Sequence, residues 1–272
     1  MKISNATYVG ANERLGLIDL EVPRNFNGKM IVFLHGFMGF KDWGAWSLVQ
    51  DYFVDQGYGF CKFNTTHNGG TAQNGIDFPD PEAFGKNTYS KEIFDVKSVL
   101  DWLNNQIDHC TVHMIGHSKG GAVSLICGSR FNQITSISTW ASIASIDGRF
   151  PKEEALDTWK KKGVRHIKNG RTMQELPQYI CLYEDYLEHR EAYHIESICR
   201  NQLKPLFIAH GEKDTSVSID HGIQLAKWSG MKLQVIPNAN HVFESKHPWT
   251  CDELPPALHE LCSLTADFIH NL

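Results

Sequence analysis

The sequence predicts an α/β domain: a doubly wound, mostly parallel sheet flanked by helices. Short apolar runs rich in Val, Ile and Phe alternate along the chain with segments of helical periodicity. This alternation is typical of parallel strands joined by right-handed helical crossovers. The 272 residues are also enough for one large hydrophobic core, and no Pro/Ser-rich linker divides them. We therefore expect a single domain over residues 1–272.

The predicted strands are short apolar runs bounded by Gly, Asn or Pro, as buried strands usually are. They are residues 30–35, 57–64, 111–116, 134–142, 205–211 and 232–237. The predicted helices carry apolar residues on one face. They are residues 90–107, 220–230 and 256–272, and a further helical stretch follows residue 118.

The composition, with 42% hydrophobic and 21% charged residues, is that of an ordinary soluble globular protein. A net charge of −5 gives no reason to expect nucleic acid or a membrane surface as partner. No apolar run approaches the ~20 residues that span a bilayer, and the N-terminus lacks the apolar core of a signal peptide. Seven cysteines without a C-x-x-C pair favour reduced thiols. We expect a cytoplasmic monomer or homodimer.

A Gly-His-Ser-Lys-Gly-Gly cluster directly follows the strand predicted at 111–116. A strand-to-helix turn this tight forces an unfavourable backbone angle on Ser118 and projects its hydroxyl above the sheet. Gly116 and Gly120 let the chains approach without Cβ clashes. Read alone, the cluster is equally an ordinary glycine turn, so the other strand ends must decide.

A serine hydroxyl needs a base to become a nucleophile, and the base needs an acid to orient it. His241 lies in a short polar loop after the strand predicted at 232–237, and His247 is a weaker candidate. Asp214 follows the strand predicted at 205–211 and is the candidate acid, although it also fits an ordinary turn aspartate. The order Ser, Asp, His along the chain places nucleophile, acid and base at successive strand ends.

The same chemistry needs donors for an oxyanion. The turn that follows the strand predicted at 30–35 would aim the Phe37 amide into the site, and the Lys119 amide is the second donor. By itself this turn is also explained as a simple strand exit. The residues expected to support these turns are His35, Gly36, Gly116, His117 and Gly120.

These motifs resemble the α/β-hydrolase superfamily. The matching stretches are LHGF at 34–37, GHSKGG at 116–121, HGEKD at 210–214 and NANH at 238–241. The resemblance implies an eight-stranded, mostly parallel sheet with a Ser-His-Asp triad. In its compact size and short insertion, the chain is similar to the dienelactone-hydrolase-like, acyl-esterase and serine-aminopeptidase-like bacterial members of this superfamily. Dienelactone hydrolases proper have a cysteine nucleophile and haloalkane dehalogenases have an aspartate at the position where this chain has Ser118. The resemblance therefore does not extend to the activity of either group.

Residues 143–200 depart from the alternation, because they are polar, aromatic and basic without a clear strand. We interpret them as a small helical lid inserted over the strand ends, with a surface excursion as the alternative. The candidate pocket residues are His67, Asn68, Trp159 and Tyr179. The basic residues that are candidates for binding an anion, such as the phosphates of coenzyme A, are Lys160, Lys161, Lys162, Arg165, Lys168 and Arg171.

The expected function is a serine hydrolase that cleaves small carboxylic esters through an acyl-enzyme intermediate. An acyl-CoA thioesterase is the alternative, followed by a peptidase or amidase. A non-catalytic receptor is disfavoured because all three triad candidates are present. No cofactor or metal is expected, since His109 and His113 flank a helix-to-strand junction and do not share a helical face.

Overall fold

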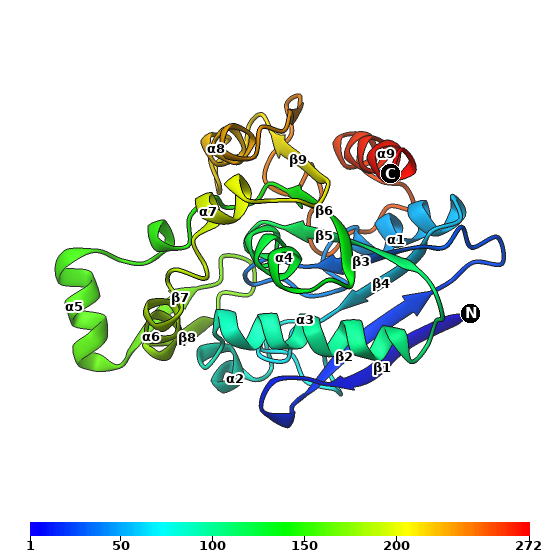
Figure 1. Ribbon diagram of the computed structural model, residues 1–272. Coiled ribbons are helices and arrows are strands. Elements are labelled where there is room, and N and C mark those ends of the chain that lie inside the picture. Colours follow the sequence, from blue (N-terminus) through cyan, green and yellow to red (C-terminus); the bar gives the residue numbers. More distant parts are fainter.

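The computed structural model describes residues 1–272 and centres on an eight-stranded sheet with helices on both faces (Figure 1). The strands are β1 (Lys2–Val9), β2 (Leu15–Glu21), β3 (Lys29–Leu34), β4 (Gly59–Phe63), β5 (Thr111–His117), β6 (Ile134–Trp140), β9 (Leu206–Gly211) and β10 (Leu233–Ile236). Their order is β1-β2-β4-β3-β5-β6-β9-β10, and only the β1–β2 and β2–β4 pairs are antiparallel. The prediction of a mostly parallel, eight-stranded sheet is confirmed.

Two apolar cores lie on opposite faces of this sheet. The helices are α1 (Trp46–Asp55), α2 (Pro81–Gly85), α3 (Tyr89–Asn104), α4 (Lys119–Arg130), α8 (Asp220–Ser229) and α9 (Pro256–His270). Within β3, Met30 and Val32 belong to the core under α3, α4 and α8, whereas Ile31 and Phe33 belong to the core under α1 and α9. Side chains on a strand alternate between faces, so one apolar strand supplies both cores. None of the helices has the length and apolar character needed to cross a bilayer.

The chain reverses its direction of travel across the sheet at β3. From β3 it moves outward to β4 and then returns to β5 on the other side of β3. In open α/β sheets such a switch point opens a crevice at the carboxyl ends of the two strands. Leu34 at the end of β3 pairs with Gly116 near the end of β5, so the loops that follow lie side by side.

The six predicted strands correspond to β3, β4, β5, β6, β9 and β10, with ends within about two residues. β1 and β2 were not expected. The first, KISNATYV, is a largely exposed edge strand, so it has no apolar run to reveal it. Edge strands with polar, exposed residues resist unwanted pairing with other chains, and here the same property hides the strand.

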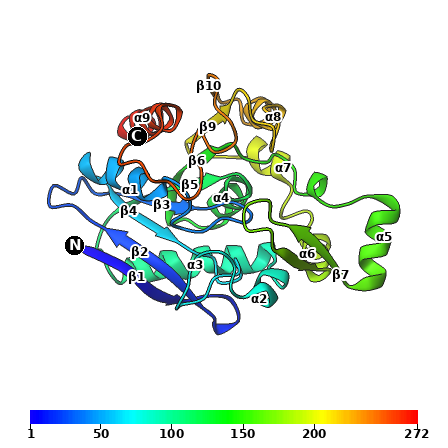
Figure 2. The ribbon, with the colours of Figure 1, turned by 180° about the vertical axis from the view of Figure 1, so that it is seen from behind.

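The segment 143–200 differs from the expected helical insertion. It contains a short 3-10 helix (Asp147–Arg149), α5 (Glu153–Lys162), β7 (Val164–Lys168), β8 (Glu175–Tyr179), α6 (Cys181–Glu188) and α7 (Ile195–Arg200). β7 and β8 form a separate antiparallel two-stranded sheet, so the expectation of no strand was wrong. β7 carries Arg165 and Lys168, and β8 carries Glu175 and Pro177, so neither strand shows an apolar pattern in the sequence. Both views show α5, β7, β8 and α6 projecting to one side of the main sheet, whereas α7 lies against α4 and α8 (Figures 1 and 2).

Candidate active site

The turn between β5 and α4 holds Ser118 in a strained conformation. Its φ is 57° and its ψ is −121°, a region that residues with a side chain rarely adopt. A Cβ on Gly116 would lie 2.3 Å from the carbonyl oxygen of Gly120. A Cβ on Gly120 would lie 2.5 Å from the carbonyl oxygens of Leu34 and His35. Glycine is therefore the residue that fits at both positions, as predicted, and the turn can close tightly against β3.

The side chains of Ser118, His241 and Asp214 form a hydrogen-bonded series. His241 Nε2 lies 3.0 Å from Ser118 Oγ, and His241 Nδ1 lies 2.7 Å from Asp214 Oδ2. The carboxylate can only accept, so Nδ1 carries the proton and Nε2 is left to accept from the serine hydroxyl. The three residues follow β5, β10 and β9, and the fold thus brings together the three candidates named from the sequence.

Asp214 is held by more than its histidine partner. Its Oδ1 accepts hydrogen bonds from the N–H groups of Ser216 (2.8 Å) and Val217 (2.9 Å). His210 Nε2 lies 3.3 Å from Oδ2 and is buried beside it. Burial pushes the pKa of Asp214 upward, but the hydrogen bonds from His210, His241 and Val217 hold it well below its usual value. The aspartate is thus both a turn residue and the ionised partner of His241.

The loops that carry these side chains are tied to one another. Lys213 N–H donates to the carbonyl oxygen of Ala239 over 2.8 Å, which joins the loops after β9 and β10. His117 Nε2 lies 2.9 Å from the carbonyl oxygen of His241, which joins the serine turn to the loop after β10. Burial lowers the pKa of His117 to about 3, so the ring is neutral and donates from Nε2. This hydrogen bond is the contact through which His117 would support the serine turn, as the sequence predicts.

The two candidate oxyanion donors lie at the ends of neighbouring strands. The Phe37 N–H has no acceptor within the chain. Lys119 is the first residue of α4, where a backbone N–H has no partner inside the helix. His35 fixes the turn before Phe37: its Nδ1 lies 2.9 Å from the carbonyl oxygen of Gly36, and its Nε2 accepts from Thr65 N–H at 3.3 Å. Neither N–H group thus has an acceptor within the chain, and Phe37, Lys119 and Ser118 line one cavity.

No protein-family model matches the chain, and no curated protein matches it. Solved structures do. Est1E from Butyrivibrio proteoclasticus, with ferulic acid bound, superimposes with a TM-score of 0.72 at 18% identity, covering 98% of both chains. The esterase Pf2001 of Pyrococcus furiosus gives a TM-score of 0.66 at 16% identity over 100% of this chain and 92% of its own. A dienelactone hydrolase from Anabaena variabilis gives a TM-score of 0.64 at 14% identity, covering 100% of this chain and 97% of its own.

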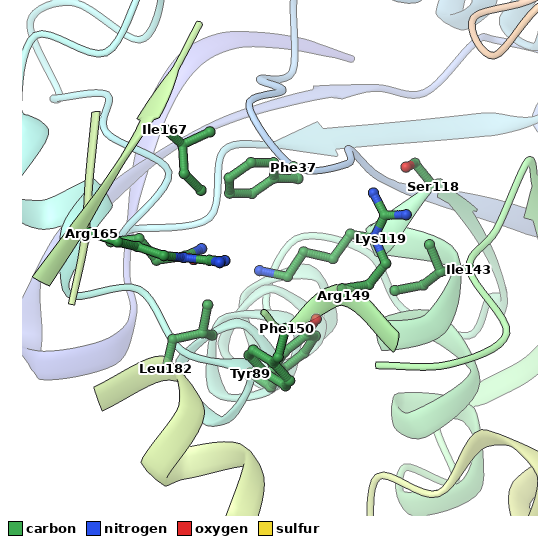
Figure 3. Close-up of a pocket in the computed structure, with 11 residues that line it drawn as sticks. Phe37, Tyr89, Ser118, Lys119, Ile143, Arg149, Phe150, Arg165, Ile167 and Leu182 are labelled. Carbon is green, nitrogen blue, oxygen red and sulfur yellow. The ribbon is translucent and has the colours of Figure 1, made fainter. Parts of the chain in front are cut away.

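The chain has the α/β-hydrolase fold. Within this fold, Ser118 and Phe37 line two neighbouring cavities. The Lys119 cavity, of about 270 Å³, is lined by Phe37, Tyr89, Ser118, Lys119, Ile143, Arg149, Phe150, Arg165, Ile167, Gln178 and Leu182 (Figure 3). The His241 cavity, of about 440 Å³, is lined by Gly36, Phe37, Met38, Gly39, Trp43, Trp46, His117, Ser118, Asn169, Gly170, Arg171, Ser216, His241 and Val242. A bound molecule would extend from Ser118 into one or both.

Four residues named as pocket candidates line neither cavity of this α/β-hydrolase fold, and these assignments are corrected. His67 is buried and its Nδ1 contacts the Thr66 hydroxyl at 3.0 Å. The Asn68 side chain bridges two loop backbones, donating to Gly39 O at 3.2 Å and accepting from Gly70 N–H at 2.8 Å. Both side chains stabilise the long loop after β4.

The two aromatic candidates also have other partners. Trp159 is buried beneath the Lys119 cavity, where its indole N–H donates to the carbonyl oxygen of Gln178 at 2.9 Å. The Tyr179 hydroxyl is hydrogen-bonded to the Glu82 carboxylate on α2. These aromatic rings hold the 143–200 segment together and anchor it to the main body. His247, the weaker base candidate, accepts from Gly44 N–H at 2.9 Å and lines neither cavity.

Arg149 and His210 are cavity or site residues that the sequence did not point to. Arg149 follows β6, so the rule that working residues gather after parallel strands would have included it. His210 is the last but one residue of β9, four positions before Asp214, and this spacing was the available signal. No group of three or more His, Cys, Asp or Glu gathers in a way that would hold a metal ion.

Proposed function

We propose that the protein is a serine hydrolase that cleaves carboxylic esters of small molecules through an acyl-enzyme intermediate. The observation that carries the proposal is the Ser118–His241–Asp214 series, with contacts of 3.0 and 2.7 Å, on a strained strand-to-helix turn. A glycine turn without chemistry would need neither the base nor the acid at its mouth. The esterase likeness of the fold agrees with this reading.

In the first half of the proposed reaction, Ser118 Oγ attacks the ester carbonyl carbon while His241 Nε2 takes its proton. The N–H groups of Phe37 and Lys119 stabilise the oxyanion that forms. Ionised Asp214 stabilises the imidazolium. His241 then gives the proton to the leaving alkoxide oxygen, and the C–O bond of the ester breaks.

In the second half, His241 deprotonates a water molecule that attacks the acyl-enzyme. The tetrahedral intermediate collapses, the proton returns from His241 to Ser118 Oγ, and the acid product leaves. The same two N–H groups hold the oxyanion in both halves. No cofactor takes part in either step.

Residues 143–200 are proposed to act as a lid insertion within a single 1–272 domain. Ile167, Gln178 and Leu182 from this segment line the Lys119 cavity, and Asn169–Arg171 line the His241 cavity. The segment therefore shapes both sides of the site and shields it from water.

The distribution of basic residues favours a simple ester over an acyl-CoA thioester. Lys160, Lys161, Lys162 and Lys168 are exposed and line neither cavity. Arg171 is paired with Asp77. Only Arg165 of the expected basic run reaches the Lys119 cavity, so the run does not form a continuous phosphate-binding surface at the site.

Turnover of 4-nitrophenyl acetate and butyrate tests the proposal. The wild-type protein is expected to hydrolyse both, and Ser118→Ala is expected to lose about a thousandfold or more in kcat. Ser129→Ala, a serine near the end of α4 and away from both cavities, is the matched control. Unchanged turnover by Ser118→Ala would refute the mechanism.

A further inference from the structure

The Lys119 cavity carries more positive charge than its neighbours neutralise. Its lining includes Lys119, Arg149 and Arg165 and no Asp or Glu. Lys119 is already paired, because its ammonium lies 2.7 Å from Glu92 Oε1. Neither arginine has a carboxylate within ion-pairing distance. Two guanidinium charges therefore remain without a counterion in the cavity wall.

The Arg165 side chain is held in the wall of the Lys119 cavity by contacts with its neighbours. Its Nε donates to Gln178 Oε1 at 2.7 Å, its Nη2 donates to the same oxygen, and its guanidinium lies 4.3 Å from the centre of the Trp159 ring. Both partners are electrically neutral. The side chain is half-buried, and this burial lowers the pKa of Arg165. Figure 3 shows Arg165 and Lys119 extending toward each other across the cavity.

A half-buried guanidinium with only neutral partners is costly, because it has lost water without gaining an opposite charge. The cost is recovered when a ligand supplies the anion. Planar arginine forks match carboxylates especially well, since two N–H groups can meet two oxygens. The remaining N–H groups of Arg165 are the donors for such a pair.

The position of His241 indicates whether the acyl part or the alcohol part of an ester occupies the Lys119 cavity. In the proposed reaction the leaving oxygen receives its proton from His241 Nε2, so the alcohol must lie on the His241 side of Ser118. His241 lines the His241 cavity and not the Lys119 cavity. The acyl chain is thus directed into the Lys119 cavity, toward Arg165.

We propose that the Lys119 cavity is an acyl subsite for an anionic acyl group, and that the substrates are half-esters of short dicarboxylic acids. This inference rests on the proposed hydrolase function for the side on which the acyl group lies. The free carboxylate pairs with Arg165, with Arg149 as the second cation. Ile143, Ile167 and Leu182 line the same cavity and cover the methylene chain. A volume of about 270 Å³ is at the small end for ligand sites and favours a short chain.

The test compares esters that differ only in charge. Monomethyl succinate, glutarate and adipate are each matched with the neutral compound in which the free carboxylate is a carboxamide. The wild-type protein is expected to show a kcat/KM at least about 10-fold higher for the half-ester at the best chain length. Equal rates, or faster turnover of the carboxamides at every length, would overturn the proposal.

Variants locate the preference. Arg165→Met is expected to lower kcat/KM for the best half-ester by about 10- to 100-fold and to change the matched carboxamide by less than about threefold. Arg165→Lys keeps the charge and is expected to restore part of the loss. Arg200→Met, an exposed arginine on α7 that is paired with Glu196, is the control and should leave the preference intact. An equal loss for charged and neutral esters would mean that Arg165 only holds the wall together, and would overturn the proposal.

A binding measurement separates this inference from the proposed reaction. Two proteins, the Ser118→Ala variant and the double variant Ser118→Ala/Arg165→Met, are each titrated calorimetrically with monomethyl glutarate and with its carboxamide. Binding that needs both the carboxylate and Arg165 supports the anionic subsite even if the wild-type protein hydrolyses no ester, an outcome that would overturn the hydrolase function alone. Absence of charge-dependent binding, with ester turnover intact, would overturn the subsite alone.

Discussion

His117 Nε2 lies 2.9 Å from the carbonyl oxygen of His241, and the two imidazole rings are 4.8 Å apart. The residue before the proposed nucleophile therefore holds the backbone of the proposed base. This contact joins two loops whose contacting residues are 124 positions apart in the sequence. Because burial keeps the His117 ring neutral, its Nε2 can donate to this carbonyl oxygen and tie the two loops together.

Removing that link should loosen the base without removing it. His117→Ala is expected to lower kcat by about 10-fold with little change in KM, because a small displacement of a catalytic group is costly. His117→Gln can donate a hydrogen bond from its amide to the same carbonyl and should recover part of the rate. Steady-state kinetics with 4-nitrophenyl butyrate measures both; identical kcat values for the two variants would show that the hydrogen bond does not position His241.

The same histidine should make the fold sensitive to acid. Burial lowers the pKa of His117 from 6.5 to about 3, so between these values the unfolded chain binds a proton that the native chain does not. The stability that this neutral ring contributes is present above pH 6.5 and is lost as the pH falls toward 3. His117→Gln should therefore reduce the pH slope of the unfolding free energy by about 1 kcal/mol per pH unit between pH 4.5 and 6. Urea unfolding at several pH values measures the slope, and parallel curves for the two proteins would contradict the assignment.

The Asp214 carboxylate should matter through its negative charge and its acceptor atoms. Asp214→Asn keeps the shape of the side chain, but its amide N–H can donate to His241 Nδ1. The imidazole proton then lies on Nε2, which can no longer accept the proton of Ser118. We expect kcat to fall by about 10³ to 10⁴. The control is Asp220→Asn, because Asp220 is exposed at the start of α8 and bonds only to Ser218 nearby. A loss below tenfold at Asp214 would argue against its role as the acid.

The serine turn should not tolerate a side chain at Gly120. A methyl group there meets two backbone oxygens at 2.5 Å, and backbone cannot move aside as a flexible side chain can. Gly120→Ala is expected to destabilise the protein by about 2 kcal/mol or more. At Gly148 the nearest atom lies at 3.5 Å, so Gly148→Ala should be close to neutral and serves as the control. Thermal unfolding compares them, and equal melting temperatures would contradict the steric argument.

The parts of the site that follow strands could be predicted from the sequence. Ser118, Asp214 and His241 each lie at or shortly after the end of a strand, and parallel strands deliver such residues to one edge of the sheet. The pattern is local, so each position can be found without knowing the tertiary contacts. The same logic identified Phe37 and Lys119 as neighbours of Ser118.

The cavity walls could not be predicted in this way. Trp159 and Tyr179 are aromatic residues in a segment that lines both cavities, yet Trp159 is buried with its indole N–H bonded to Gln178, and the Tyr179 hydroxyl is bonded to α2. Which face of β7 and β8 turns inward depends on the pairing of these strands, and their polar sequence does not reveal it. Arg165 and Arg171 are six residues apart but line different cavities, because Arg165 lies in β7 and Arg171 lies in the turn that follows it.

Labelling with a fluorophosphonate probes whether Ser118 is an activated nucleophile. The reagent phosphonylates a serine only where a base activates the hydroxyl and donors stabilise the oxyanion, and peptide mass spectrometry identifies the modified residue. We expect one adduct, on Ser118, which is abolished in Ser118→Ala and strongly slowed in His241→Ala. A native protein that fails to react, or that is modified at another serine while Ser118 stays free, would contradict it.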